Sequence, residues 1–196
     1  MDDASLKPLT FSPRPIPGLI LITPRVHRDA RGFFLETYNA RAYQDGGIEA
    51  SFVQDNFSLS TFGTIRGLHA QLTQPQGKLI SVAEGEIFDV AVDIRVGSPT
   101  YGQWDGVHLR ADSFQQFYIP PGFAHGFCVL SPQAKVAYKV TDFYDASDEV
   151  VIAWNDPDLG IQWPVTEPTL SERDRQAPRL AEHQVRLSTQ QANTTP

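Results

Sequence analysis

Residues 120–127 read Pro-Pro-Gly-Phe-Ala-His-Gly-Phe, and the apolar run Cys128-Val129-Leu130 follows them. The two prolines and Gly122 predict a tight turn, because proline restricts φ and glycine adopts conformations that other residues avoid. This turn presents His125 just before an apolar strand. Two interpretations stay open at this point. His125 either faces a ligand from a rigid turn or hydrogen-bonds to the neighbouring loop backbone.

Strand patterns dominate the chain on both sides of this turn. Short apolar segments bounded by Pro, Gly, Asp or Ser occur at residues 19–22, 32–36, 79–82, 87–94, 116–119 and 135–140. In residues 87–94, alternation places the apolar side chains from Phe88 to Ile94 on one face and Asp89 and Asp93 on the other. These carboxylates would line a cavity, meet solvent or accept structural hydrogen bonds. The pattern predicts an all-β sandwich or barrel.

Helix is expected to be a minor component. Residues 39–44 predict one or two helical turns with Asn39 as the N-cap, and residues 171–174 predict another helix start near the C-terminus. The last ten residues, 187–196, are polar and lack apolar periodicity, which predicts a flexible tail. We expect the remainder of residues 1–196 to form a single domain, since this length falls within the usual range for one.

Composition excludes several classes of protein. The net charge of −7 argues against non-specific binding to nucleic acid or to an anionic membrane, because both select clustered positive charge. Cys128 is the only cysteine, so no intramolecular disulfide can form, and its apolar neighbours predict a buried thiol. No apolar stretch approaches the ~20 residues that span a bilayer, and no basic segment followed by an apolar run opens the chain. We expect a soluble cytoplasmic protein.

The stretch Arg66-Gly67-Leu68-His69-Ala70-Gln71 carries the strongest chemical signal, and Lys78 follows nine residues after His69. Histidine acts as a base near neutral pH, whereas Arg and Lys supply fixed positive charge, so the set indicates proton abstraction from an anionic substrate. An ideal strand sends residues three apart to opposite faces. Arg66 and His69 therefore share a site only if the chain twists or bulges, which Gly67 permits.

One feature points to a known fold. The proline-glycine turn followed by His125 resembles the second half of the cupin signature, which implies a double-stranded β-helix, or jelly-roll, barrel. A metal-binding cupin would carry in the first half two histidines separated by one residue and a Glu after them, whereas this chain has His69-Ala70-Gln71. We therefore expect no metal at this site.

From Asp29 to about Leu180, the chain more specifically resembles the dTDP-4-dehydrorhamnose 3,5-epimerase family. The resemblance rests on long motifs at residues 29–36, 52–56, 65–69, 76–79, 88–93, 119–127, 154–157 and 170–174. It implies that His69 is the base that removes a proton beside a ketone and that Asp174 supports its imidazole. Tyr138 would be the acid on the opposite face, and Lys78 would stabilise an enolate at the C4 oxygen.

The resemblance also implies a binding site for a nucleotide-sugar. Its residues would be Arg31, Glu36, Gln54, Asp55, Asn56, Arg66, Lys78, His125, Glu149 and Arg173, with Tyr144 stacking on thymine. Arginines would pair with the diphosphate through parallel donors. Local pattern alone favours Tyr138 as a core aromatic residue and Asp174 as a carboxylate that stabilises the first turn of a helix. Two departures from the family, Ala70 in place of an aromatic residue and a short loop at residues 71–76, alter the wall beside the base.

The implied activity is the cofactor-independent conversion of dTDP-4-dehydro-6-deoxy-D-glucose to dTDP-4-dehydro-L-rhamnose by inversion at C3 and C5. The alternatives are an epimerase that inverts one centre, a keto-sugar isomerase of an antibiotic pathway, and a cupin that binds a sugar nucleotide without turning it over. Family resemblance further implies a homodimer in which the N-terminal strands cross to the partner, and it leaves open whether Arg31 and Glu36 act in their own site or in the neighbour's.

Overall fold

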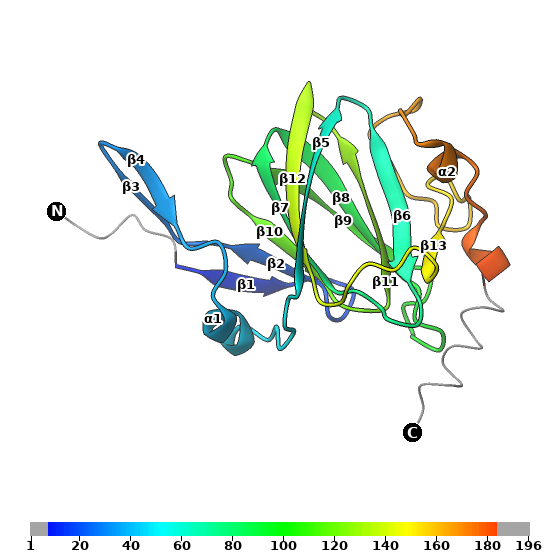
Figure 1. Cartoon of the computed structure of the whole chain (residues 1–196), viewed down its shortest axis with the longest axis horizontal. Helices are drawn as coiled ribbons and strands as arrows, with labels where there is room; N and C mark the ends of the chain where they lie inside the picture. The colour runs from blue at the N-terminus through cyan, green and yellow to red at the C-terminus, as the bar shows by residue number, and fades with distance from the viewer. Residues whose placement is uncertain (1–7, 184–196) are drawn as a thin grey trace.

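The computed structural model describes residues 8–183, so the predicted tail lies outside the described residues. Two antiparallel sheets face each other across the body of the molecule (Figure 1). The six-stranded sheet has the order β1 (Thr10–Pro13), β2 (Ile20–Thr23), β10 (Gln116–Ile119), β7 (Lys78–Glu84), β12 (Gln133–Val140) and β5 (Gln54–Thr61). The five-stranded sheet has the order β13 (Glu149–Val151), β6 (Ile65–Gln71), β11 (Phe123–Val129), β8 (Glu86–Asp93) and β9 (Trp104–Arg110).

The smaller elements lie outside these two sheets. A hairpin of β3 (Val26–Asp29) and β4 (Gly32–Leu35) projects from one end of the molecule (Figure 1). The helices are α1 (Ala40–Asp45), α2 (Glu172–Arg175) and the 3₁₀ helix η1 (Leu180–His183). Among residues 8–183, no helix is long and apolar enough to cross a membrane.

The predicted all-β architecture is confirmed, and strand alternation explains how it forms. Ile80 of β7, Phe117 of β10 and Phe127 of β11 belong to one buried cluster, to which both sheets contribute. The predicted apolar face of β8, together with the next residue, Ile94, belongs to a second cluster that includes residues of the C-terminal segment such as Ile152. Because β8 is buried on both faces, it anchors the five-stranded sheet.

The other face of β8 carries Asp89 and Asp93, and both are fully buried. Asp89 pairs with His125 at 2.9 Å. Asp93 accepts hydrogen bonds from the Arg95 guanidinium and from two hydroxyl groups, those of Ser98 and Thr100. The sequence leaves three possibilities open for this face, and the structure supports the last of them. Both carboxylates act as structural hydrogen-bond acceptors.

The predicted helix starts are confirmed by their caps. The side chain of Asn39 accepts hydrogen bonds from the backbone N–H groups of Arg41 and Ala42, and that of Ser171 accepts one from Asp174. His125 differs from the prediction, because it lies inside β11 and not before it. Its backbone pairs with Ala91 of β8, so the strand already includes the residues that follow the turn.

Candidate active site

A cavity of about 350 Å³ opens between the two sheets. Its walls come from β5, β6, β7, β11 and β12, and the C-terminal part of the chain closes one side. The lining residues are Gln54, Asn56, Ser58, Arg66, His69, Ala70, Gln71, Gln76, Lys78, His125, Phe127, Tyr138, Tyr144, Glu149 and Arg173. The structure thus gathers most of the predicted site residues around one space.

Gly67 explains how Arg66 and His69 reach the same cavity. Its φ of +122° lies in a region that side chains rarely adopt, and a Cβ there would lie 2.5 Å from the Cα of Gly126. The pairing of β6 with β11 shifts register between His125 and Phe127, beside this close approach. The predicted irregularity at Gly67 is confirmed, and it brings two residues three positions apart to the same cavity.

His69 forms a close pair with Asp174. The imidazole Nε2 lies 2.7 Å from Oδ1 of Asp174, whose side chain is only 4% exposed. Burial raises the pKa of the Asp174 carboxyl, but its interactions with His69, together with the Ser171 hydrogen bond and the charge of Arg173, outweigh burial, so the pKa lies below its usual range. An ionised Asp174 accepts the Nε2–H and leaves Nδ1 as the basic nitrogen. Nδ1 lies 4.0 Å from Oε1 of Glu149.

Tyr138 belongs to β12, in the sheet opposite the one that carries His69. Burial raises the pKa of the Tyr138 hydroxyl, the positive charge of Arg66 lowers it, and the net shift is upward. The phenol therefore stays protonated at neutral pH. An imidazole and a protonated phenol consequently line one cavity from different sheets.

Lys78 and His125 form part of the same wall. Lys78 is 7% exposed, and burial lowers its pKa to about 8, although the negative charges of Glu149 and Asp89 oppose this shift. Its ammonium group is therefore charged at pH 7. His125 lies directly opposite His69 in the β6–β11 pairing, and its Nε2 forms a hydrogen bond with Oδ2 of Asp89.

Glu149 links Tyr144 and Arg173 at the rim of the cavity. Its Oε2 accepts a hydrogen bond of 3.0 Å from the Tyr144 hydroxyl and also pairs with the Arg173 guanidinium. The Glu149 side chain is 9% exposed, whereas Tyr144 is 51% exposed. The rim therefore presents an exposed aromatic ring beside a cation, which suits a nucleoside diphosphate.

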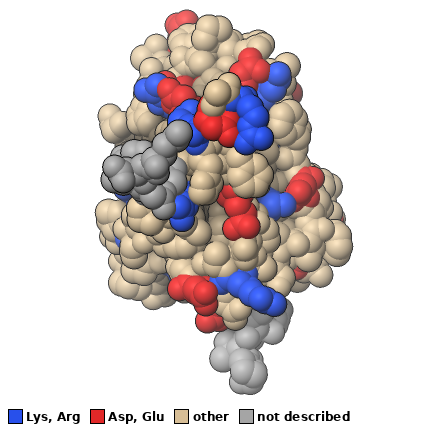
Figure 2. All heavy atoms as spheres, turned by 90° about the vertical axis from the view of Figure 1, so that its left-hand side faces the viewer, with Lys and Arg blue, Asp and Glu red and all other residues tan. Residues whose placement is uncertain are grey.

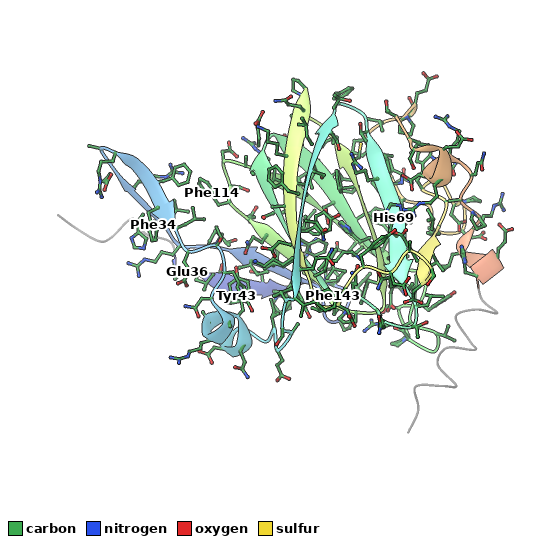
Figure 3. All side chains as sticks on the ribbon, in the orientation of Figure 1. Phe34, Glu36, Tyr43, His69, Phe114 and Phe143 are labelled. Carbon is green, nitrogen blue, oxygen red and sulfur yellow. The ribbon has the colours of Figure 1, made fainter. Side chains whose placement is uncertain are left out.

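Three predicted site residues lie away from this cavity. Asp55 points to the other face of β5, where it pairs with Lys139 at 2.9 Å. Arg31 lies at the tip of the β3–β4 hairpin and binds Asp29, with its side chain 90% exposed. Figure 3 shows Glu36 at the hairpin end of the molecule and His69 toward the opposite end.

Sequence reasoning missed Ser58 and Phe127, which line the cavity, and it expected Ala70 and the loop from Gln71 to Gln76 only as part of the wall beside His69. Strand alternation could have found Ser58, because Gln54 and Asn56 share its face of β5. The same alternation places Asp55 on the opposite face of β5 from Gln54 and Asn56. Within residues 8–183, no group of three or more His, Cys, Asp or Glu residues is arranged to hold a metal ion.

Comparison with known proteins places this cavity in context. A family model described as dTDP-4-dehydrorhamnose 3,5-epimerase matches residues 13–182. The enzyme of that name from Pseudomonas aeruginosa is 54% identical over 169 residues, which cover 85% of this chain and 93% of the relative. The one from Methanothermobacter thermautotrophicus is 50% identical over 173 residues, which cover 87% of this chain and 94% of the relative.

A solved structure is similarly close. The Legionella pneumophila dTDP-6-deoxy-D-glucose-3,5-epimerase, crystallised with dTDP-4-keto-L-rhamnose, superposes with a TM-score of 0.89 at 49% sequence identity. The match covers 92% of this chain and 97% of that one. The similarity therefore extends to the whole architecture around the cavity.

Proposed function

Because the chain belongs to the dTDP-4-dehydrorhamnose 3,5-epimerase family, we propose that it converts dTDP-4-dehydro-6-deoxy-D-glucose to dTDP-4-dehydro-L-rhamnose. The enzyme is a carbohydrate epimerase that inverts C3 and C5 of the hexose. The observation that carries the proposal is the placement of His69 and Tyr138 on different sheets around one cavity. A base and an acid on opposite faces of a sugar ring convert proton removal and return into inversion.

The reaction begins with proton transfer from carbon to His69. The hydrogens at C3 and C5 are acidic because each carbon adjoins the C4 ketone, so Nδ1 of His69 takes one of them as a proton. The electron pair of the C–H bond moves into the enolate, and the ammonium of Lys78 stabilises the charge on O4. Asp174 supports the imidazolium that forms.

Tyr138 completes each inversion. Its hydroxyl gives a proton to the carbon from the opposite face, the enolate electrons form the new C–H bond, and the ketone returns. Solvent then restores the phenol and removes the proton from His69. The second centre follows the same steps, because both carbons flank one ketone. No redox cofactor is required, since a proton leaves carbon and a proton replaces it.

Substrate binding uses the outer part of the cavity. Arg66 and Arg173 pair with the diphosphate, and Tyr144 stacks on the thymine ring. Gln54, Asn56, His125 and Glu149 also line this space and bind polar groups of the substrate. With the nucleotide held at the rim, the hexose lies between the base and the acid.

An NMR experiment in deuterated water tests this function. Purified protein and a His69→Ala control receive dTDP-4-dehydro-6-deoxyglucose, and deuterium is followed at C3 and C5 before the product is trapped by reduction. Deuterium at both carbons with an L-rhamno product supports the proposal. Label and inversion at one centre would identify the single-centre alternative, and migration of the keto group would identify the isomerase. No exchange that depends on His69, with dTDP binding intact, would identify a binding cupin.

We further propose that the protein is a homodimer. Several large apolar side chains are exposed near the hairpin and on β5, namely Phe33, Phe34, Phe57 and Leu59. Phe33 and Phe57 line an apolar groove that also includes Phe114. The face at the hairpin end mixes charges of both signs with wide uncharged areas (Figure 2). A second copy would cover this apolar surface, which a monomer rarely exposes.

Dimerisation would also give Arg31 and Glu36 a role. Neither lines the cavity of its own chain, so we propose that the hairpin places them at the partner's cavity. Subunit exchange tests this: an Arg31→Ala protein mixed with a His69→Ala protein forms mixed dimers with one intact site. Recovered exchange activity supports action in trans, and no recovery after mass spectrometry verifies mixing contradicts it.

The cytoplasmic location also belongs to this proposal. Cys128 is buried and unpaired, which is compatible with a reducing compartment. Fractionation of the native host, with the protein followed by an antibody, would test the location.

A further inference from the structure

The loop from Thr141 to Asp148 joins β12 to β13 and carries Tyr144 to the rim of the cavity. Its residues 143–147 are exposed, so hydrophobic burial does not fix their positions. Phe143, next to Tyr144, is itself 64% exposed and lies below the sheets in Figure 3. The backbone of this loop must therefore be held by polar contacts.

Gln71 supplies the central contact. Its Nε2 donates to the backbone carbonyl of Phe143 at 3.1 Å, and its Oε1 accepts from the backbone N–H of Asp145 at 2.9 Å. One amide thus binds the backbone immediately before and immediately after Tyr144. Gln71 comes from β6, two residues after His69, and is 4% exposed.

Two further glutamines extend this pattern along the loop. The Nε2 of Gln76 donates to the carbonyl of Asp142 at 2.8 Å, and Gln76 is 8% exposed. The backbone N–H of Tyr144 donates to Oε1 of Gln54 at 3.2 Å. Side-chain amides therefore bind the main chain of each residue from Asp142 to Asp145.

The remaining hydrogen-bond capacity of Gln71 indicates its role. Its Nε2 also donates to the carbonyl of Gln74 at 2.9 Å, so both N–H groups are used within the protein. No donor is left for a substrate. Gln71 therefore lines the cavity as a support for its neighbours and not as a ligand-binding donor.

We propose that Gln71, assisted by Gln76, is a positioning residue that holds Tyr144 in place for the base of the nucleotide. This inference rests on the proposed function, because it assigns a support to the nucleotide end of the same site. A loop held in its binding geometry loses less conformational freedom when the ligand binds. Gln71 should accordingly control affinity for the nucleoside and leave proton transfer at the hexose unchanged.

The test compares Gln71→Ala with the wild type in three measurements. Calorimetry gives the Kd for dTDP and for inorganic pyrophosphate, and deuterium exchange gives kcat and KM for the dTDP-sugar. We expect Kd for dTDP and KM to rise roughly tenfold, as for the loss of a buried hydrogen-bond partner. We expect the Kd for pyrophosphate and kcat to stay within about twofold of the wild type.

A double-mutant cycle separates positioning from general loosening. In a Tyr144→Ala background, Gln71→Ala should cause no further loss of dTDP affinity, because the ring that it positions is absent. Gln76→Ala offers the same comparison if Gln71→Ala fails to fold. Gln162→Ala is the control, since Gln162 is exposed and donates to the Gly160 carbonyl outside the cavity.

Each unfavourable outcome has its own meaning. Additive losses in the cycle, equal weakening of pyrophosphate, or a fall in kcat at unchanged KM would overturn the positioning role. Unchanged dTDP affinity in both glutamine variants would overturn it as well. Failure of the wild type to bind dTDP or to exchange deuterium would instead reject the proposed function, so the two failures are distinguishable.

Discussion

The imidazole Nε2 of His69 lies 2.7 Å from Oδ1 of Asp174, although 105 residues separate the two in the chain. His69 belongs to β6, and Asp174 lies in the single turn of α2. Ser171 caps that turn by accepting a hydrogen bond from the backbone N–H of Asp174. The cap thus fixes the backbone from which the carboxylate reaches the His69 imidazole.

Asp174→Asn should lower kcat by about 10²–10⁴, because an amide no longer selects the imidazole tautomer with a free Nδ1 or stabilises the imidazolium. Affinity for dTDP should stay near the wild-type value, since Asp174 does not line the cavity. Deuterium exchange and calorimetry measure the two effects. Ser171→Ala is the companion variant and should cost about 1 kcal/mol of stability with a smaller loss of rate. Wild-type turnover in Asp174→Asn would contradict the assignment.

Lys78 should impose an alkaline limit on activity. Its pKa is lowered to about 8 by burial, so the stabilising cation is present below that pH and is lost as pH rises through it. We expect kcat/KM, which reports ionisations of the free enzyme, to fall above about pH 8. In Lys78→Arg the fall should move to higher pH, because arginine stays charged. An identical alkaline limb in both proteins would assign it to another group.

The same lysine predicts a pH-dependent stability. Its folded pKa of about 8 lies below the ordinary value of 10.5, so the unfolded state binds more protons between these limits. The contribution of Lys78 to stability should therefore rise with pH across that window. Urea unfolding of the wild type and of Lys78→Met at pH 7 and pH 10 measures this effect. The free energy of unfolding of the variant, relative to that of the wild type, should be lower at pH 10 than at pH 7. A difference in unfolding free energy between the two proteins that is the same at both pH values would refute the lowered pKa of Lys78.

Tyr138→Phe should separate exchange from inversion. The phenol is held protonated by burial, which raises its pKa, and phenylalanine keeps the ring while removing the proton donor. His69 can still remove a substrate proton and return a deuteron to the same face. We expect deuterium incorporation without a change in configuration, followed by NMR and by reduction of the sugar. Normal yields of inverted product would exclude Tyr138 as the acid.

Gly67→Ala should destabilise the fold and distort the site. The residue combines φ of +122° with a would-be Cβ 2.5 Å from the Gly126 backbone, so strain and overlap act together. Each such feature costs ~1–3 kcal/mol. Gly63→Ala is a matched control, because Gly63 has φ of +74° but no atom within 4 Å of its Cβ position. It should lose only about 1 kcal/mol, and equal losses in chemical denaturation would argue against the steric component.

Local sequence was sufficient for much of the fold. Alternation along residues 87–94 identified the apolar and carboxylate faces of β8, Asn39 identified the first helix cap, and residues 171–174 identified the second helix start. These features depend on neighbours within a few residues, so periodicity and side-chain chemistry reveal them. The position of Gly67 beside Arg66 also predicted the irregular strand.

Members of the site could be named from motifs, but their arrangement could not. Asp55 lies within the same motif as Gln54 and Asn56 and yet faces away from the cavity. Arg31 and Glu36 belong to a segment that the fold carries away from His69. The supporting glutamines, Gln71 and Gln76, became visible only when the loop that they bind was placed beside them.

The sequence by itself therefore determined an all-β chain and its two short helices, and it named the residues that we propose as base, acid and cations. Only the tertiary structure decided that His69 meets Asp174, that Tyr138 faces the cavity from the other sheet, and that Gln71 holds the loop of Tyr144. The physical reason is the separation along the chain over which each kind of interaction acts. Strand and cap signals arise between neighbours in the chain, whereas these pairings depend on how distant strands align and on which side chains burial forces together.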